Sequence, residues 1–407
     1  VRVSSIFYME TERNAFITSL SQFTLLTNLR EMKLKNIEAI KCLIQIAHED
    51  GNYLQGSWTQ VLHCISELAK IQILGSSMRH NEHVPASTPA PKSLSDTKLT
   101  AIPQSSNSLP HDGQSFEGIN ASAVVDHIDL SEIDRIFSNT VNLNDNAIVE
   151  FVRCLCDTSV LEVSTNRNSE PRTFSLQKLI EVAYYNMERI RFVWARIWGI
   201  MADHFKQVGC HSNLKVAMYA VDSLRQLAMK FLAKDELANY HFQKDFLKPF
   251  EHIVVNNKSL QIRELVVSCL SQMILARAKN IRSGWKSIFM VFTFVATGSE
   301  QSIVFLAYLM QDKIIMEYFS LVANSFFVEC VECLTAFASN RHFKEVGVKA
   351  VESIGFCAQQ LAEGNVLPHL READSTENLS LFTTDEDHLK YWLPILYGLS
   401  EVIGHPH

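Results

Sequence analysis

The chain has 407 residues, of which 47% are apolar and 20% are charged, and its formal net charge is −7. Such a composition is typical of folded proteins with a substantial core, and the negative charge argues against general nucleic-acid binding, because that activity needs a basic surface to neutralise phosphates. The sequence has no uninterrupted apolar run of about 18 residues, so we expect no transmembrane helix.

Apolar residues at steps of three and four predict helices over residues 1–75. The start of the chain, VRVSSIFY, alternates weakly and leaves a strand open, although we favour the end of a helix. A loop with Gly51 and Gly56 separates a helix over 33–47 from one that begins at Trp58. The expected apolar sides are Phe16, Leu20, Phe23 and Leu26 in a helix over 14–26, and Ile37, Ile40, Leu43, Ile44 and Ala47 in the next helix.

Residues 76–129 differ in composition from the rest of the chain. Five of the ten prolines lie here, and Ser, Thr, Asn and Gly fill much of the remainder. A segment of this kind cannot bury enough apolar surface to offset the entropy of ordering it. We therefore expect a disordered Ser/Pro-rich insert between two helices.

Residues 130–365 resume the helical pattern. One predicted helix carries an apolar face on residues at steps of three and four, namely Leu214, Ala217, Val221, Leu224, Ala228 and Phe231. Helix pairs begin near Phe242, Ser283 and Asn324, about 40 residues apart, which is the period of HEAT and armadillo repeats. We therefore predict an all-α fold, a HEAT/armadillo-like α-solenoid of stacked helical hairpins. A loop at 366–384 and the start of a further, truncated repeat at 385–407 are expected to follow.

The cysteines and the large aromatic residues fit a core better than a chemical site. Cys330 and Cys333 form a CxxC with no second CxxC and no nearby His pair, and they share an apolar helical stripe, so we expect both thiols in the core. The nine scattered cysteines favour reduced thiols in the cytosol over a disulfide framework. Trp194, Trp198 and Phe205 recur at helical steps, so a core stripe is favoured over a ligand box.

No arrangement of residues indicates catalysis. Asp203–His204 and Glu251–His252 are adjacent pairs, and neighbouring side chains on a helix point in different directions. The sequence also lacks a phosphate loop, a GxSxG elbow and a GxGxxG motif. We therefore predict no catalytic residues, no cofactor and no metal site.

Two basic clusters contrast with the acidic chain. The first has four basic residues and no acid in ten positions, at a predicted corner between helices with Ser283 as N-cap: Arg277, Lys279, Arg282 and Lys286. The second lies near a predicted helix break and consists of Arg189, Arg191 and Arg196. Ordinary solvated charge explains such clusters, and the alternative is a docking surface for an acidic partner or an anionic membrane.

Long blocks in a fixed order carry a resemblance that covers nearly the whole chain apart from the insert. They include YYNMERIRFVWARIW, AVDSLRQLAMKFL, FQKDFLKPFEHI and NIRSGWKSIF, together with MKLKNIEAIKCLIQIAHEDGNYLQGSW at 32–58, DRIFSNTVNLNDNAIVEFVRCLC at 134–156 and YWLPILYGLS at 391–400. These blocks resemble the large Arf guanine-nucleotide-exchange factors, and within them the brefeldin A-inhibited exchange proteins. The similar region lies downstream of their catalytic Sec-seven domain, so residues 1–75 would be the helical segment that follows this domain.

The resemblance implies an α-solenoid without its own exchange activity, because no stretch is similar to the catalytic domain. It implies a regulatory and targeting region that acts in Golgi and endosomal vesicle trafficking, in a cytoplasmic protein peripheral on Golgi, trans-Golgi and endosomal membranes. The implied partners are a GTP-bound Arf-family GTPase, other regions of the same exchange factor and the anionic Golgi membrane, and a homodimer stays open. The alternatives are a generic HEAT-repeat scaffold or transport adaptor unrelated to Arf, and a catalytically competent exchange factor.

Overall fold

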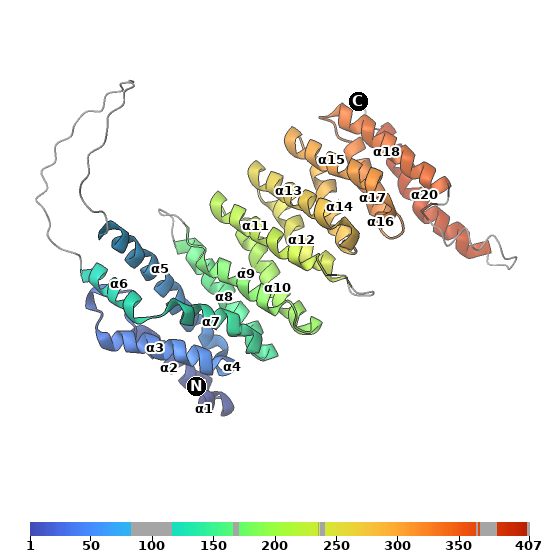
Figure 1. Cartoon of the computed structure of the whole chain (residues 1–407). Coiled ribbons are helices and arrows are strands. Elements are labelled where there is room, and N and C mark those ends of the chain that lie inside the picture. The colour runs from blue at the N-terminus through green and yellow to red at the C-terminus, as the bar shows by residue number, and fades with distance from the viewer. Residues whose placement is uncertain are drawn as a thin grey trace, which may run out of the picture. The chain divides into compact units, whose positions relative to one another are not determined.

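The computed structural model describes residues 1–82, 116–165, 171–234, 236, 241–363, 365–366 and 381–404, and these residues form helices and no strand (Figure 1). The all-α prediction is therefore confirmed. Contacts divide the chain into two compact units, Val1–Thr158 and Ser159–His407. The boundary falls inside a helix, whereas the sequence predicted that the repeats begin at residue 130.

The first unit consists mainly of short and medium helices. Its elements are α1 (Arg2–Ile6), α2 (Glu10–Phe23), η1 (Leu29–Glu31), α3 (Leu34–Glu49), α4 (Gly51–Leu54), η2 (Gln55–Ser57), α5 (Trp58–Glu82), α6 (Phe116–His127), α7 (Leu130–Ser138), η3 (Asn139–Asn142) and most of α8 (Asp145–Thr165). The chain therefore starts in a helix and not in a strand. All five predicted apolar positions of α3 are buried, as expected.

The predicted apolar side of α2 is wrong. Phe16 and Phe23 are 51% and 47% exposed, whereas Ile17 is fully buried. Leu26 is buried too, but it lies beyond the end of the helix. An isolated helix with apolar residues on several sides does not specify which side is covered, and here the packing of α2 against α3 and α5 decides it.

The predicted insert is too wide. Helix α5 continues to Glu82, and α6 lies within the predicted range of 76–129. Helix α6 packs against α5 and η1, where Ala121 and Val124 are buried and Asn120 Nδ2 donates to the Leu29 carbonyl at 2.6 Å. The proline and serine content of the whole segment concealed this short apolar helix. The middle of the predicted insert, 83–115, lies outside the described residues.

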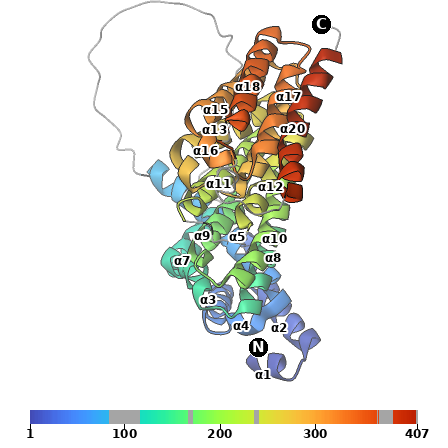
Figure 2. The ribbon, with the colours of Figure 1, turned by 90° about the vertical axis from the view of Figure 1, so that its right-hand side faces the viewer.

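The second unit is a stack of helical hairpins. Its helices are α9 (Phe174–Asn186), α10 (Arg191–Gly209), α11 (Leu214–Phe231), α12 (Phe242–Asn256), α13 (Leu260–Arg277), η4 (Ala278–Asn280), α14 (Gly284–Ala296), α15 (Gln301–Glu317), α16 (Phe319–Val322), α17 (Phe327–Ala338), α18 (Lys344–Ala362) and α20 (Leu381–Gly404). One row contains α10, α12, α14, α17 and α20, and the other contains α9, α11, α13, α15 and α18 (Figure 2). The predicted α-solenoid is confirmed.

The predicted repeat starts agree with the structure in two of three places. Helix α12 begins at Phe242, and α14 follows Ser283. The third pair begins later than predicted, because the short helix α16 precedes α17. Of the predicted loop at 366–384, residues 367–380 lie outside the described residues, and α20 begins at Leu381, before the predicted start at 385.

Aromatic and sulfur-containing side chains fill the space between the stacked helices. Trp198 of α10 stacks on Phe246 of α12 with ring centroids 3.9 Å apart, and Trp194 and Phe205 are also buried. The predicted core stripe is confirmed. Cys330 and Cys333 are fully buried as well, so their predicted place in the core is confirmed.

Asparagine side chains fasten successive hairpins to each other at one end of the helices. Asn257, after α12, donates from Nδ2 to the Gly209 carbonyl at the end of α10 at 2.9 Å, and its Oδ1 accepts from the Ser259 N–H at 2.8 Å. Asn340, after α17, donates to the Ala296 carbonyl at the end of α14 at 2.6 Å. These bonds satisfy helix-end carbonyls that have no partner inside their own helix.

The role of α6 can be tested with a matched pair of substitutions. Val124→Ala should lower the free energy of unfolding by about 2 kcal/mol, because it removes buried methyl groups and leaves a cavity. Ile119→Ala on the same helix should have little effect, because Ile119 is 49% exposed. Urea unfolding followed by circular dichroism measures both changes. Equal effects of the two substitutions would show that α6 does not contribute to the core.

The adjacent residues Asn256 and Asn257 test the asparagine contacts. Asn257→Ala should cost about 1–3 kcal/mol of unfolding free energy, because the Gly209 carbonyl and the Ser259 N–H lose their partner in a buried place. Asn256→Ala should cost much less, since Asn256 is exposed and its Nδ2 bonds only to its own helix, at the His252 carbonyl. Thermal and urea unfolding provide the measurement. If the two variants are equally stable, the contact between hairpins contributes little.

Candidate interaction surface

The first basic cluster lies at the corner between α13 and α14. Arg277 ends α13, Lys279 lies in η4, and Arg282 precedes α14. Their side chains are exposed, whereas Ala278 and Ile281 between them are buried. Within the described part of the chain, none of the three basic side chains forms an ion pair. The buried residues fix the corner on the stack, and the charged ones face solvent.

Ser283 takes the predicted N-cap position of α14, and Lys286 forms an ion pair. The Lys286 Nζ lies 3.1 Å from Glu329 Oε1, so this half-exposed charge is paired with a carboxylate of α17. Ser283 occupies the N-cap position of α14, but its hydroxyl makes no capping bond. Its Oγ donates to Oε1 of Glu236 at 2.6 Å and its N–H to Oε2 at 2.8 Å. Because Glu236 Oε1 also accepts from the Gln243 N–H at 2.9 Å, the carboxylate joins the starts of α12 and α14.

The backbone of this corner is held by side-chain amides. Gln243 accepts from the Arg282 N–H at 2.7 Å through Oε1 and donates to the Asn280 carbonyl at 3.0 Å through Nε2. Asn280 in turn donates from Nδ2 to the Leu232 carbonyl at the end of α11, at 3.0 Å. The basic side chains therefore project from a backbone whose conformation is fixed by the preceding hairpin.

The second basic cluster lies at the corner between α9 and α10. The predicted helix break is confirmed, because α9 ends at Asn186 and α10 begins at Arg191. The Arg189 Nε donates to Oδ1 of Asn186 at 2.6 Å, and the buried Asn186 donates from Nδ2 to the Val182 carbonyl at 2.8 Å. Arg196 is exposed and lies farther along α10.

The end of α11 joins the two clusters. The Lys230 Nζ contacts the hydroxyl of Tyr184 at the end of α9 and lies 4.1 Å from the centre of its ring. Lys234 forms an ion pair with Glu188 in the α9–α10 corner. Leu232, between the two lysines, accepts the hydrogen bond from the α13–α14 corner. Three successive corners thus lie side by side at the same end of the helices.

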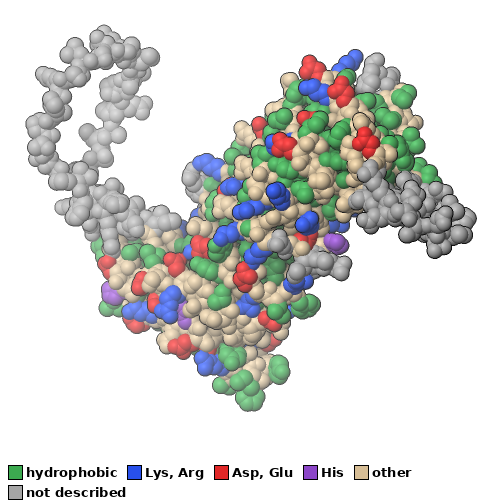
Figure 3. Space-filling model, turned by 45° about the vertical axis from the view of Figure 1, so that its right-hand side comes forward, with side chains coloured by type: hydrophobic (Ala, Val, Ile, Leu, Met, Phe, Trp, Pro, Cys, Tyr) green, Lys and Arg blue, Asp and Glu red, His purple; other side chains and the backbone are tan. Residues whose placement is uncertain are grey.

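We call this surface the basic edge, and it consists of Arg189, Arg191, Lys230, Lys234, Arg277, Lys279 and Arg282. Sequence reasoning identified both clusters but missed the lysines between them. The sequence did contain a signal that these corners are related, namely an equal spacing of basic residues. Lys234 follows Arg189 by 45 residues, and Lys279 follows Lys234 by 45 residues. Figure 3 shows one face of the molecule, on which Lys and Arg side chains gather with Asp and Glu interspersed.

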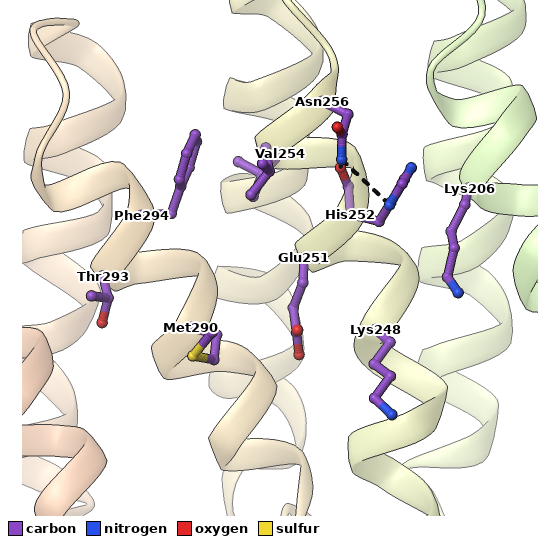
Figure 4. A pocket seen from close by; sticks show the side chains of 10 residues that line it. Lys206, Lys248, Glu251, His252, Val254, Asn256, Met290, Thr293 and Phe294 are labelled. Carbon is purple, nitrogen blue, oxygen red and sulfur yellow. Dashed lines mark hydrogen bonds between the residues drawn. The ribbon is translucent and has the colours of Figure 1, made fainter.

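A separate groove of about 510 Å³ lies on the row of α10, α12 and α14 (Figure 4). Its apolar part includes Val255, Met290 and Phe294, and its polar part includes Glu251 and His252. Burial raises the pKa of the Glu251 carboxyl, and a hydrogen bond from a neighbouring serine hydroxyl opposes that shift. Glu251 and His252 point in different directions, as predicted, so they do not form a catalytic pair.

Two titratable groups in the core, His204 and Cys333, have pKa values that burial moves away from neutral pH. Burial lowers the pKa of His204 to about 4, and its Nε2 lies 3.2 Å from the Ser159 hydroxyl. Burial also raises the pKa of the Cys333 thiol to about 12. The imidazole is therefore neutral and the thiol is protonated at pH 7, and a protonated thiol is a poor nucleophile.

The described residues offer no metal centre and no membrane span. No group of three or more His, Cys, Asp and Glu side chains in this part of the chain is placed to hold a metal ion. Of the helices that the structure describes, none is both long enough and apolar enough to cross a membrane. The basic edge and the groove are two surfaces of the second unit that could serve for interaction.

Comparison with known proteins gives matches over the whole chain. Residues 230–313 match a family model described as Mon2/Sec7/BIG1-like, HDS. The chain is 38% identical to brefeldin A-inhibited guanine nucleotide-exchange protein 3 of Arabidopsis thaliana, in an alignment that covers 100% of this chain and 25% of that protein. It is 41% identical to protein 1 of the same name from Mus musculus, covering 99% of this chain and 22% of that protein.

The human protein 1 gives the same values, with 41% identity, 99% of this chain and 22% of the relative. The chain thus spans about a quarter of the length of the curated relatives that it matches. A solved engineered protein aligns with 97% of this chain and 100% of its own at 12% identity, with a TM-score of 0.29, which is too low to indicate a common fold. The chain is therefore similar over its whole length to a region of the brefeldin A-inhibited guanine nucleotide-exchange proteins that lies outside their Sec-seven catalytic domain.

Proposed function

We propose that this chain is the regulatory and targeting region of a large Arf guanine-nucleotide-exchange factor in Golgi and endosomal vesicle trafficking. Its relatives are named as guanine nucleotide-exchange proteins, and the match lies outside their catalytic domain. The region acts by docking its basic edge where GTP-bound Arf is held on the anionic surface of Golgi, trans-Golgi and endosomal membranes. The parent protein is cytoplasmic and binds these membranes peripherally.

The observation that carries this proposal is the position of the basic edge. Five of its seven residues lie inside the segment 230–313 that matches the family model. In a chain of net charge −7, the edge brings Lys and Arg side chains together on three neighbouring corners. One of them, Lys234, is paired with Glu188, and the Arg277, Lys279 and Arg282 corner forms no ion pair within the described residues. Anionic lipid attracts each Lys or Arg near its surface by about 1 kcal/mol, so several aligned charges together give useful affinity.

The proposal also assigns no exchange activity to this chain. Exchange requires a group that enters the phosphate and magnesium site of the GTPase, and the helical stack supplies none that we can identify. Addition of the chain to nucleotide-loaded Arf should leave the rate of nucleotide release unchanged, with the Sec-seven domain of a relative as positive control. A tenfold or greater acceleration by the chain alone would assign catalysis to it.

Charge reversal tests the basic edge. The triple variant Arg277→Glu, Lys279→Glu and Arg282→Glu should bind anionic liposomes carrying GTP-loaded Arf about a hundredfold more weakly, because it removes three favourable charges of about 1 kcal/mol each and adds repulsion. Lys286 is left unchanged, since it is paired with Glu329. Binding is measured by liposome flotation over a range of salt concentrations, and the native affinity should fall as salt rises.

The matched control reverses three exposed lysines at other positions of the stack. Lys258 lies in the α12–α13 corner, at the other end of α13 from the basic edge, while Lys344 and Lys349 lie in the first half of α18. Both triple variants should fold, because exposed charges contribute little to stability. Equal binding of both variants to the liposomes contradicts the role of the edge. Binding that does not depend on Arf or lipid would favour the generic scaffold.

A further inference from the structure

The α9–α10 corner of the basic edge carries two strongly exposed apolar side chains. Ile190 is 67% exposed and Phe192 is 72% exposed, with Arg191 between them. The next two residues, Val193 and Trp194, are buried at 1% and 3% exposure. A branched aliphatic and an aromatic side chain are therefore turned outward immediately before the chain enters the core.

The corner holds these two side chains in a defined position. Ile190 is the N-cap residue of α10, and its carbonyl accepts the Val193 and Trp194 N–H groups at 3.0 Å each. On the preceding side, the Arg189 N–H donates to the Asn186 carbonyl at 3.1 Å. The exposed pair thus belongs to an ordered turn, and little conformational entropy is lost when the pair is buried by a partner.

The surroundings of the pair combine basic and amphipathic side chains. Arg189 and Arg191 flank Ile190 in the chain, and Lys230 lies against Tyr184 at the end of α9. Tyr184 and Tyr185 are 47% and 43% exposed. Peripheral membrane proteins bind the boundary between lipid headgroups and acyl chains with surfaces that combine apolar residues with lysine, arginine and tyrosine.

We propose that Ile190 and Phe192 insert into the acyl boundary of an anionic bilayer when the basic edge docks on it. This inference rests on the proposed function and adds a second, apolar contribution to it. Charge attraction alone is reversible and sensitive to salt, and stable membrane binding generally combines a basic patch with an apolar anchor. The turn projects its apolar pair beside positive charges, so the charge complementarity favours an anionic lipid surface as the occupant.

A partition experiment on the full chain tests the insertion. Vesicles of phosphatidylcholine, with and without phosphatidylserine, are floated with the native chain and with the double variant Ile190→Gln and Phe192→Gln. The double variant should bind the phosphatidylserine vesicles roughly tenfold more weakly, while the dependence on salt stays the same. The control is Leu309→Gln with Met316→Gln on α15, because these residues are 63% and 65% exposed and lie away from the corner.

Fluorescence quenching measures how deeply the α9–α10 corner enters the bilayer. In a Phe192→Trp variant, brominated acyl chains should quench the fluorescence of the introduced tryptophan, whereas a Leu309→Trp variant should be quenched much less.

Insertion is overturned if the Phe192→Trp variant shows no added quenching and the glutamine variant binds as the native chain does. The proposed function would stand in that case, provided the charge-reversal variant still binds more weakly. A change of oligomeric state in the glutamine variant, without a change in lipid binding, would instead overturn insertion and assign the corner to an interface between copies.

Discussion

The second unit depends on the fact that each helical hairpin can bury its apolar face only against the next hairpin. Trp198 of α10 stacks on Phe246 of α12, and Phe246 also stacks on Phe231 of α11 at 4.7 Å. Every such layer shares its side chains with two neighbours. The hairpins therefore stabilise one another in sequence, and a single hairpin would expose the surface that its neighbours now cover.

Stacking also buries backbone polar groups at the helix ends, and asparagine side chains provide hydrogen-bond partners for several of them. Helix ends carry carbonyl and N–H groups without partners inside the helix, and a close stack excludes water from some of them. Asn257 and Asn340 bond to the ends of the preceding hairpins on one side, and Asn280 bonds to the Leu232 carbonyl on the other. The same amide group satisfies donors and acceptors at once, which explains why asparagine recurs at these corners.

The location of the candidate surface follows from this architecture. Helix faces are used for stacking, so the corners are where charged side chains can gather without loss of core. Arg189, Lys234 and Lys279 lie 45 residues apart in the sequence and come from three successive corners, α9–α10, α11–α12 and α13–α14. In the interior, burial lowers the pKa of His204 and raises that of Cys333, so both side chains are uncharged at neutral pH.

The sequence by itself determined the helical class, the stacked-hairpin architecture and the burial of several apolar stripes, because these depend on local periodicity. It located α12 and α14 within one or two residues and placed Cys330, Cys333 and the Trp194–Phe205 stripe in the core. Both basic clusters were also visible as local excesses of charge.

Only the tertiary structure decided which helix faces meet and which charges adjoin. It buried Ile17 of α2 in place of the predicted Phe16 and Phe23, placed α6 in the first unit, and paired Lys286 with Glu329. It also joined the clusters through Lys230 and Lys234 into one edge. These features depend on contacts between different helices, and local periodicity contains no information on which side chains of separate helices will meet.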